Sequence, residues 1–567
     1  MFETLTSEAQ KLLKTMGSEA MKVAWKWEKP ADVNHGDITT TVALQLARIL
    51  KKSPRDVADE LAAKVGKLSG VERCEVAGAG YINVWLTPKA LLEELAVTRK
   101  ACTPAVTRKK EAPVIVEYCS LNIAKPLGVH HILTTMIGQV IANLYAHEGT
   151  PVVRWNYLGD WGTQFGKLFV AFEKWGAGAD PAKISLNELL ALYVKFHEEA
   201  EKDPELEARG QAAFKRLEDG DREVRHVWQA FVDVTKRAVA PVLERLSARF
   251  DTDVGESHYE SAMAPIIEEG KKKGVFTKGE KGATIVQFPP PSTLPPAVVL
   301  KSDGGTNYLT RDLALVVDRI ARYHPAAILH VVGVEQTLHF QQLMATAKLL
   351  EWELPVWEHI VFGRMRFADQ SMSTRKGTIL HLEEVLDEAV RRADAIIKDR
   401  GDAIQSDDPK ELGEMMGIGA VVYGILSQNR KMDIVFDWDK MLSFEGNSAP
   451  YLQYTHARAR SVIRKAGADS AKTSPAVKTL TVHERQLLGK LLQFSSVLEH
   501  ARTERLPHVL ANYLHQLCQD FNTFYNVDPI LTAPEAERAF RLLLTDSAAT
   551  VLKTGAEILT LRVPERM

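Results

Sequence analysis

A strand, a helix and a second strand follow one another between residues 114 and 158, and this pattern constrains the fold more than any other feature. The apolar stretch at 114–118 leads through the turn "NIAKPLGVHH" into a helical pattern over about 130–147, which Gly149 ends. The stretch "PVVRWNYLG" then predicts another strand. This spacing is typical of a βαβ unit with parallel strands. We therefore predict an α/β fold built on a parallel sheet.

The alternation is interrupted and then resumes. Residues 185–250 are densely charged, with apolar positions at helical spacing, and predict an inserted helical segment. After it, "AVVLKS", "AAILHVVG" and "HIVFG" predict further strands of the same sheet, with helices from about Thr310 and Thr337. In a doubly wound sheet, ligands bind beyond the carboxyl ends of the strands. The turns that follow these strands are therefore where we look for chemistry.

Two further domains are expected, because 567 residues are too many for one core. Residues 1–108 predict a small α+β domain, in which "VERCEV" and "YINVWL" form strands around the turn "AGAG". After about 385 we expect helices only. The predicted order is a core over 112–385, a helical connector over 386–445 and an all-α domain over 446–567.

Composition excludes several classes of protein. The net charge of −2 means that any contact with nucleic acid comes from local patches. No apolar stretch approaches 18 uncharged residues, so we expect no membrane span. The first 17 residues carry charged and polar side chains where a signal peptide needs an apolar core. The four cysteines lie far apart without metal-ligand spacing, so we expect a cytoplasmic protein with no structural metal.

The turn "NIAKPLGVHH" is the first candidate site. The start of a helix favours a bound anion, because its backbone N–H groups are free and the helix dipole is positive there. His130 and His131 could add donors to the same phosphate. The two histidines could equally be side chains of an ordinary first helical turn.

Six motifs together resemble the class I arginyl-tRNA synthetases, from about Gly36 to the closing "RVPERM". They are "VEYCSLNIAKPLGVHH", "GDWGTQFGK", "SDGGTNYLTRDLA", "GVEQTLHFQQL", "SMSTRKGT" and "GNSAPYLQYTHARARSVIRK". The resemblance implies a Rossmann catalytic core, an N-terminal tRNA-binding domain and a C-terminal anticodon-binding domain. It also implies that L-arginine reacts with ATP, accompanied by Mg²⁺, to give arginyl-adenylate, and that the arginine then passes to the 3′ end of tRNA(Arg).

The resemblance assigns five residues to the arginine pocket. Carboxylates pair with a guanidinium in a bidentate manner, and Glu117 and Asp312 are the acids at the matching positions. Asn122 and Gln336 are implied to hold the amino-acid end of the substrate, and Tyr308 to bound the pocket. Without the resemblance, the sequence favours an ordinary surface or capping role for each of these side chains, and the resemblance reverses that preference.

The ATP site departs from the family pattern in two places. The segment "SMSTRKGT" (371–378) resembles the KMSKS loop, but Ser371 replaces its first lysine, and Lys125 is implied to substitute. The family turn reads His-x-Gly-His, whereas this chain has Gly-Val-His-His from Gly128 to His131. His130 either stacks on the adenine or replaces the missing histidine as a donor. The implied catalytic residues are Lys125, His130, His131 and Lys376, and the implied ATP-binding residues are Gly128, His130, His131, Met372, Ser373, Arg375 and Lys376.

The last motif predicts RNA contacts. Tyr451, Tyr454 and Arg458 fall on one helix face, and such a face suits unstacked bases and phosphates of an anticodon loop. Two tyrosines at this spacing could also belong to a core. The expected partners are tRNA(Arg), L-arginine and ATP, with no membrane and a monomeric chain. The rearranged turn and the missing lysine leave one alternative, a synthetase-derived RNA-binding or regulatory protein with impaired activation.

Overall fold

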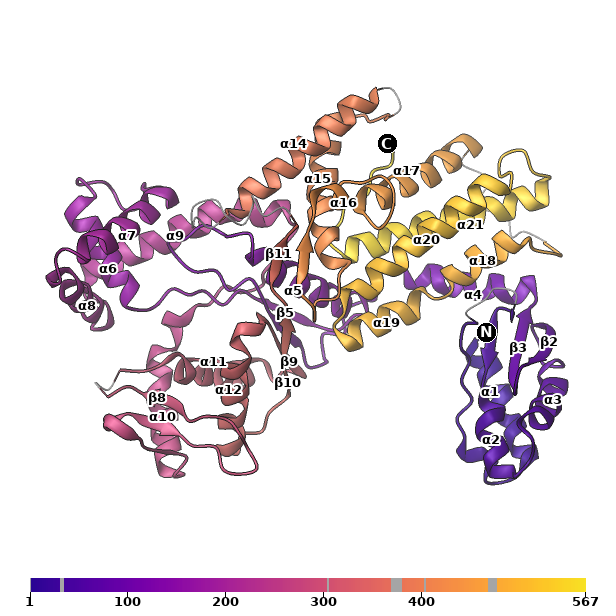
Figure 1. Ribbon diagram of the computed structural model, residues 1–567, viewed down its shortest axis with the longest axis horizontal. Coiled ribbons are helices and arrows are strands. Elements are labelled where there is room, and N and C mark those ends of the chain that lie inside the picture. Colours follow the sequence, from indigo (N-terminus) through magenta and orange to yellow (C-terminus); the bar gives the residue numbers. More distant parts are fainter. Residues whose placement is uncertain (1, 31–34, 303–304, 369–379, 402–403, 468–476) are drawn as a thin grey trace.

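The computed structural model describes residues 2–30, 35–302, 305–368, 380–401, 404–467 and 477–567. The N-terminal domain stands at one end of the molecule, and helix α4 (Pro88–Ala101) runs from it along the C-terminal helices (Figure 1). The parallel sheet lies in the middle. In the described residues, no helix is both long and apolar enough to cross a membrane.

The N-terminal domain packs helices on a small antiparallel sheet in the order β1-β3-β2. The predicted hairpin around "AGAG" is present as β2 and β3. Pro54 and Pro88 begin their helices, as expected where the missing N–H costs nothing. The elements are α1 (Phe2–Leu13), β1 (Ile38–Thr40), α2 (Val42–Leu50), α3 (Pro54–Val65), β2 (Val71–Ala77) and β3 (Tyr81–Leu86), with short 3-10 turns at Lys14–Met16 and Ala20–Lys22.

The central sheet has four parallel strands in the order β10-β9-β4-β5. Its central strands are covered on both faces, which is why they read as apolar stretches rather than alternating ones. The predicted βαβ unit is confirmed. The elements are β4 (Val114–Glu117), α5 (His131–His147), β5 (Val152–Trp155), α11 (Tyr308–Tyr323), β9 (Ala327–Gly333), α12 (Thr337–Leu349) and β10 (Val356–Phe362).

The prediction that "AVVLKS" belongs to this sheet is wrong. The strand β8 (Ala297–Leu300) pairs antiparallel with β7 (Thr284–Val286), which pairs with β6 (Phe276–Lys278). Val299 is fully buried and Val298 is exposed, so β8 has one covered face and suits a small one-sided sheet. The neighbouring helices are α10 (Met263–Lys272) and the 3-10 segments Glu256–Ala262 and Glu280–Gly282.

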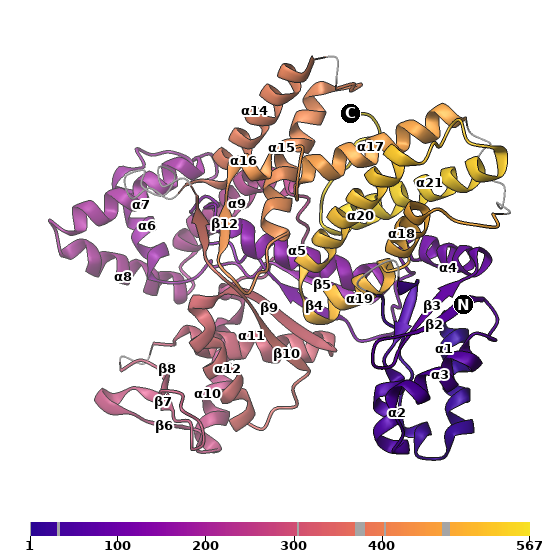
Figure 2. The ribbon, with the colours of Figure 1, turned by 45° about the vertical axis from the view of Figure 1, so that its right-hand side comes forward.

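The inserted segment is helical and extends away from the sheet at the opposite side from the N-terminal domain (Figure 2). It contains α7 (Leu186–Ala200), α8 (Glu205–Glu218) and α9 (Arg222–Arg245), and α6 (Thr163–Trp175), which precedes it, is joined to α8 by the ion pair of Lys167 and Glu207. The helix α9 leads back toward the core, where Thr235 of α9 accepts a hydrogen bond from the backbone of Ala124.

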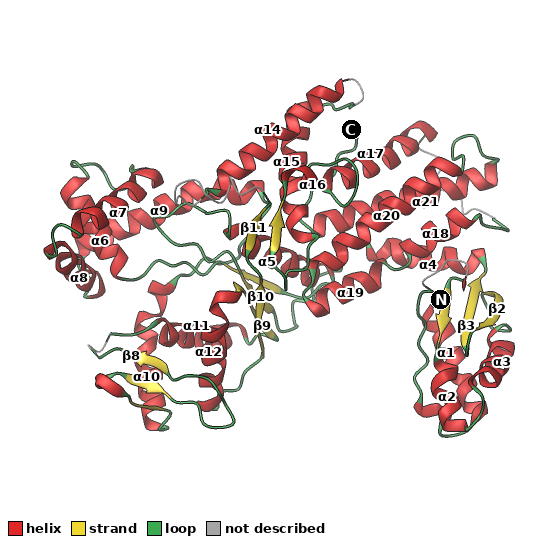
Figure 3. Cartoon of the chain, viewed as in Figure 1, coloured by secondary structure: helices red, strands yellow, loops and turns green. Residues whose placement is uncertain are grey.

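The C-terminal part is almost entirely helical (Figure 3). The expectation of helices only after 385 is wrong at β12 (Ile434–Phe436), which pairs parallel with β11 (Met365–Phe367). Three residues are too few to show a strand period, and the partner strand lies almost seventy positions earlier. The helices are α14 (Leu382–Arg400), α15 (Pro409–Leu426), α16 (Trp438–Met441), α17 (Ala449–Ala466), α18 (Val482–Leu491), α19 (Phe494–Glu504), α20 (Pro507–Val527) and α21 (Glu535–Ile558).

Candidate active site

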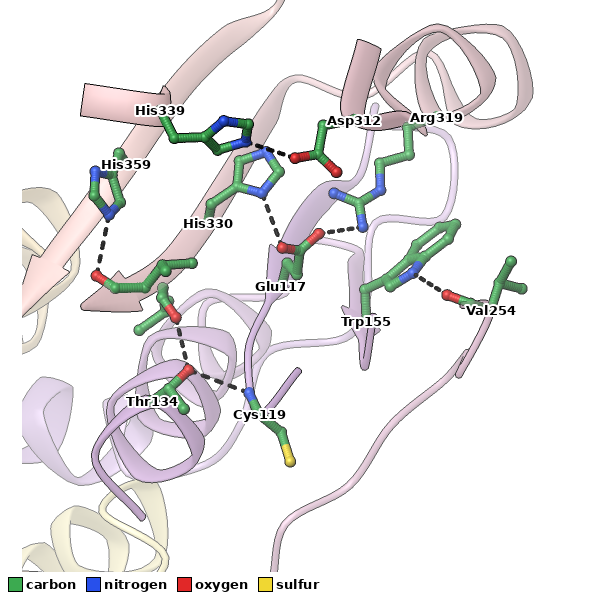
Figure 4. A network of polar contacts seen from close by, with 12 residues as sticks. Glu117, Cys119, Thr134, Trp155, Val254, Asp312, Arg319, His330, His339 and His359 are labelled. Carbon is green, nitrogen blue, oxygen red and sulfur yellow. Dashed lines mark hydrogen bonds and ion pairs between the residues drawn. The ribbon is translucent and has the colours of Figure 1, made fainter. Parts of the chain in front are cut away.

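A buried ionic cluster lies at the carboxyl end of β4, and we call it the floor of the site. Glu117, the last residue of β4, is 3% exposed. One carboxylate oxygen faces Nδ1 of His330 at 3.1 Å, and the other accepts a hydrogen bond from Arg319 of α11 (Figure 4). The Arg319 guanidinium also lies 4.3 Å from the ring centroid of Trp155. The floor therefore consists of Glu117, Arg319, His330 and Trp155.

The floor holds Glu117 in its charged form. Burial raises the pKa of this carboxyl, but the charge of Arg319 and the contacts of His330 outweigh burial and bring the pKa to about 2. Sequence reasoning assigned Glu117 to a substrate guanidinium. In the structure, a guanidinium of the protein itself already occupies one oxygen, so direct contact between Glu117 and arginine stays a prediction.

A second group of side chains is more open, and we call it the rim: Tyr308, Asp312, His339 and Glu256. Nε2 of His339 lies 2.6 Å from Oδ2 of Asp312, and the two side chains are 13% and 19% exposed (Figure 4). The ring of Tyr308, which is exposed, stands edge-on to His339 at 5.2 Å. Asp312 and Arg319 are seven residues apart on α11, so one helix face supplies both rim and floor.

Glu256 is an acid of this site that sequence reasoning missed. It pairs with Nη1 of Arg311 at 3.0 Å, yet burial, helped by the neighbouring Asp312 and Asp160, raises its pKa to about 7. The loop is held in place because Asp160 accepts hydrogen bonds from the backbone and hydroxyl of Ser257. The sequence carries no motif that marks Glu256, because its partner Arg311 lies 55 positions later in the chain and only the fold brings the two together.

A phenol completes the surroundings of the two rim acids. The hydroxyl of Tyr157 is buried and has no hydrogen-bond partner within the described ranges. Burial raises its pKa far above the usual value, and the negative charges of Asp312 and Glu256 add to the effect. The phenol therefore keeps its proton and can donate a hydrogen bond to a ligand or to one of these acids.

Asn122 and Gln336 lie at the same edge of the sheet but on its surface. Asn122 follows β4 and is bridged to Gly159, where a side chain would meet the Asn122 amide. Gln336 ends the 3-10 turn Val334–Gln336 that follows β9. Both residues are exposed, and in the part of the chain that the structure describes we find no hydrogen bond or ion pair between them and the floor or rim.

The turn that leads into α5 carries the predicted phosphate ligands. Nδ1 of His131 lies 3.0 Å from the backbone nitrogen of Gly128 and 3.1 Å from its carbonyl oxygen, so Gly128 holds the ring by its Nδ1 edge. Burial, with a contribution from His130, lowers the pKa of His131 to about 4, so the ring is neutral at pH 7. The two imidazoles lie 4.1 Å apart. Lys125 points its ammonium toward Tyr193 of α7, 5.1 Å from the ring centroid.

The segment that follows the predicted KMSKS-like loop returns to this turn. The N–H of Val129 donates to Leu380, and that of Leu382 donates to Leu127, around a bridge between Gly128 and His381. The loop at 371–378 itself, with Met372, Ser373, Arg375 and Lys376, lies outside the described residues. Its return point is nevertheless beside the turn to which the sequence assigns ATP.

A second candidate site lies among the C-terminal helices. A cleft of about 730 Å³ is lined by Tyr454 and Arg458 of α17 and by Tyr525 of α20. The Arg458 guanidinium lies 4.6 Å from the Tyr454 ring and 5.0 Å from the Tyr525 ring. Tyr451 is not part of the lining, and its hydroxyl accepts a hydrogen bond from Asn522. The cleft combines aromatic faces with further positive charge from Arg464, Lys465 and Arg566.

Comparison with known proteins defines first the class of this fold and site. Residues 92–438 match the family model "tRNA synthetases class I (R), catalytic domain". Residues 3–86 match "Arginyl tRNA synthetase N terminal domain", and residues 452–567 match "DALR anticodon binding domain". A parallel core with a strand-end site and two flanking domains is thus the architecture of a class I tRNA synthetase.

Comparison with whole chains of known proteins shows to which family within this class the chain is similar. The arginine–tRNA ligase of Clostridium perfringens is 38% identical over 92% of this chain and 93% of its own, and that of Clostridium kluyveri is 36% identical over 99% of each. The solved arginyl-tRNA synthetase of Thermus thermophilus covers all of both chains with a TM-score of 0.81 at 28% identity. The chain belongs to the arginyl-tRNA synthetase family.

Proposed function

We propose that this chain is an arginine–tRNA ligase, which activates L-arginine with ATP and transfers it to the 3′ end of tRNA(Arg). The observation that carries the proposal is the acidic rim: Asp312 lies near Glu117 at the carboxyl end of β4, and Glu256 lies close enough to Asp312 for the two charges to interact. Acids suit the guanidinium of the substrate, and the start of a helix suits the phosphates of ATP. The names of the curated relatives support the same activity.

The rim is the proposed arginine site. His339 contacts Oδ2 of Asp312, which leaves the other carboxylate oxygen for the substrate guanidinium. Tyr308 bounds the pocket on its exposed side. Glu117 contributes the negative charge of its carboxylate to the pocket from the buried floor. Asn122 and Gln336 are proposed to hold the amino and carboxyl groups of the substrate, since both are exposed at the edge where the strands end.

The start of α5 is the proposed ATP site. Gly128 holds the ring of His131 at Nδ1, so Nε2 is the atom that we assign to a phosphate oxygen, and Lys125 supplies positive charge. His130 and Gly128 complete the turn, and Met372, Ser373, Arg375 and Lys376 act from the loop at 371–378. Mg²⁺ enters with ATP. In such a site the protein positions the reactants and stabilises the charge that develops on the phosphates as the arginine carboxylate attacks and diphosphate leaves.

The flanking domains are the proposed tRNA-binding parts. Tyr454 and Arg458 offer the cleft among the C-terminal helices to unstacked bases, with Tyr451 supporting them through Asn522. We place the domain limits at 1–108, 112–385 with its insertion at 185–250, 386–445 and 446–567. The protein is proposed to act as a cytoplasmic monomer.

The decisive experiment measures arginine-dependent exchange of diphosphate into ATP with the purified chain, with and without tRNA, followed by charging of tRNA(Arg). Exchange and charging with arginine, and not with lysine, support the proposal. Binding of tRNA without exchange under either condition contradicts it and favours the RNA-binding alternative.

A further inference from the structure

The turn that presents Lys125 has a backbone conformation that must be held from outside. Ala124 has φ of 62°, in the left-handed region that residues with a side chain rarely adopt. It immediately precedes Lys125, so its conformation sets the direction in which the lysine leaves the backbone. Ala124 is buried, and its N–H therefore needs a hydrogen-bond partner.

That partner comes from the inserted helices. The N–H of Ala124 donates to the hydroxyl of Thr235 at 3.0 Å, and this hydroxyl in turn donates to the carbonyl oxygen of Phe231, one turn earlier in α9. Thr235 is fully buried. With its proton engaged by Phe231, the hydroxyl has only lone pairs to offer the turn, which matches the single donor of Ala124.

The side chain of Lys125 rests on the same inserted segment. Its ammonium lies 5.1 Å from the centroid of the Tyr193 ring, a distance at which a cation is attracted to the face of an aromatic ring. The cavity where the turn meets α6 and α7, lined in part by Lys125 and Tyr193, is only about 10 Å³ and too small for a ligand. The backbone before the lysine and the lysine side chain are thus both held by helices that lie outside the sheet.

The neighbouring residues of the turn are held by other elements. The N–H of Ile123 donates to Gly159, in the loop after β5, and the N–H of Val129 donates to Leu380. These bonds fix the two ends of the turn. The bond to Thr235 fixes its middle, at the position from which Lys125 projects.

We propose that the inserted helices position Lys125 for the phosphates of ATP, with Thr235 as the positioning residue for the turn and Tyr193 for the lysine side chain. This inference rests on the proposed function, in which Lys125 meets phosphate charge. It gives the insertion a role in the activation step.

The test compares Thr235→Val with Thr235→Ser in the full-length chain. Valine keeps the shape but removes the acceptor, and serine keeps the acceptor. We expect valine to lower kcat of diphosphate exchange by about tenfold or more, because small misplacements of a group in an active site have effects of this size. The KM for arginine and the affinity for tRNA should stay within about twofold of the original, and serine should restore kcat.

The matched control is Thr346→Val. Thr346 is also fully buried, and its hydroxyl also donates to the carbonyl one turn earlier, that of Gln342 in α12. Among the described residues, no hydrogen bond joins the Thr346 side chain to the turn at Lys125. A kcat that falls equally in Thr346→Val and Thr235→Val would show a general loss of packing and would overturn the inference.

A double-mutant cycle with Lys125→Ala asks whether the effect passes through the lysine. If it does, Thr235→Val reduces kcat strongly in the original chain and hardly at all in the Lys125→Ala background, since coupled residues are not additive. Full additivity overturns the inference. Tyr193→Leu, at a half-buried position, repeats the cycle without a change in the core and decides the matter if Thr235→Val does not fold.

The two proposals fail differently. A chain that shows no arginine-dependent exchange contradicts the proposed function, and the inference fails with it. A chain that is active, with Thr235→Val and Tyr193→Leu both as active as the original, contradicts only the role of the inserted helices.

Discussion

The floor and the rim of the candidate site contain acids of the same kind in opposite situations. Glu117 in the floor is buried and matched by Arg319 and His330, which hold its pKa at about 2. Glu256 in the rim is also paired with an arginine, but burial prevails and raises its pKa to about 7. The Glu117 carboxylate is charged at every pH well above 2, whereas the Glu256 carboxyl gains and loses its proton near neutral pH.

This difference indicates how the site divides its work. A buried charge needs partners at all times, so the floor belongs to the folded structure whether or not a ligand is present. In the rim, the two carboxyl groups face, among the described residues, only one arginine, Arg311, and one histidine, His339. A substrate cation bound there would add positive charge that the protein itself does not provide. We therefore expect changes in the floor to affect folding and changes in the rim to affect binding.

The largest effect is expected from Arg319→Met in the floor. The substitution leaves Glu117 buried without its cation and should reduce the free energy of unfolding by about 3–5 kcal/mol, as measured by denaturant titration. Adding Glu117→Gln should recover part of the loss, because the uncompensated charge disappears.

The control on the same helix is Arg322→Met. Arg322 is 46% exposed and paired with Asp318, so its loss should change stability by no more than about 1 kcal/mol. Equal effects at the two positions would contradict the distinction between a buried floor and an ordinary surface pair.

For Asp312→Ala in the rim, we expect a large loss of arginine binding and little change in stability. Hydrogen bonds to a charged group contribute roughly 1.5–3 kcal/mol each, so loss of this carboxylate should lower kcat/KM for arginine at least about tenfold. The free energy of unfolding should remain within about 1 kcal/mol of the original, since Asp312 is partly exposed. Asp318→Ala, further along α11, serves as the control and should leave the kinetics unchanged. Near-normal arginine kinetics in Asp312→Ala would remove this residue from the pocket.

The fold could be predicted from the sequence wherever the apolar pattern of an element shows which of its faces are buried. The strand β4, helix α5 and strand β5 follow from apolar periodicity. The four residues of β8 were assigned to the wrong sheet, because a short apolar stretch does not specify its neighbours. β12 was missed, since it exists only through pairing with β11.

The candidate site could be predicted only where a motif carries it. Asp312 and Tyr308 were found through a resemblance, and the structure places them together beside His339. Arg319 could not be found, because a charged residue on an amphipathic helix looks like a solvent-exposed one. Its partner lies 202 positions away, and only the tertiary fold brings the two together.

The third prediction concerns the pH dependence of stability at the rim. Because the pKa of Glu256 is raised from 4.5 to about 7, the folded state binds more protons than the unfolded state between these values. Its contribution to stability is therefore present below pH 4.5 and is lost as pH rises toward 7 and above. Relative to Glu256→Gln, the original chain should lose on the order of 1 kcal/mol of unfolding free energy between pH 5 and 8.

In the floor, the stability contribution of the carboxyl changes with pH in the opposite direction. The contribution of Glu117 is present above pH 4.5 and is lost as pH falls toward 2, so Glu117→Gln should leave the slope between pH 5 and 8 unchanged. Glu173→Gln, at an exposed position, provides a further control. Parallel curves for the original chain and Glu256→Gln would show that this carboxyl titrates normally.

The smallest effect is expected from His339, which contacts the rim acid rather than the substrate. Its ring donates to Oδ2 of Asp312 and packs against Tyr308, so it should fix the direction of the carboxylate. A single hydrogen bond contributes about 0.5–1.5 kcal/mol net, so His339→Ala should raise the KM for arginine about two- to tenfold with kcat nearly unchanged. His339→Gln, which can still donate, should recover part of the loss, and His226→Ala on the exposed face of α9 should have no effect. A fall in kcat of about a hundredfold with an unchanged KM would instead mean that His339 meets charge developing in the transition state, and the rim would then extend to the ATP phosphates.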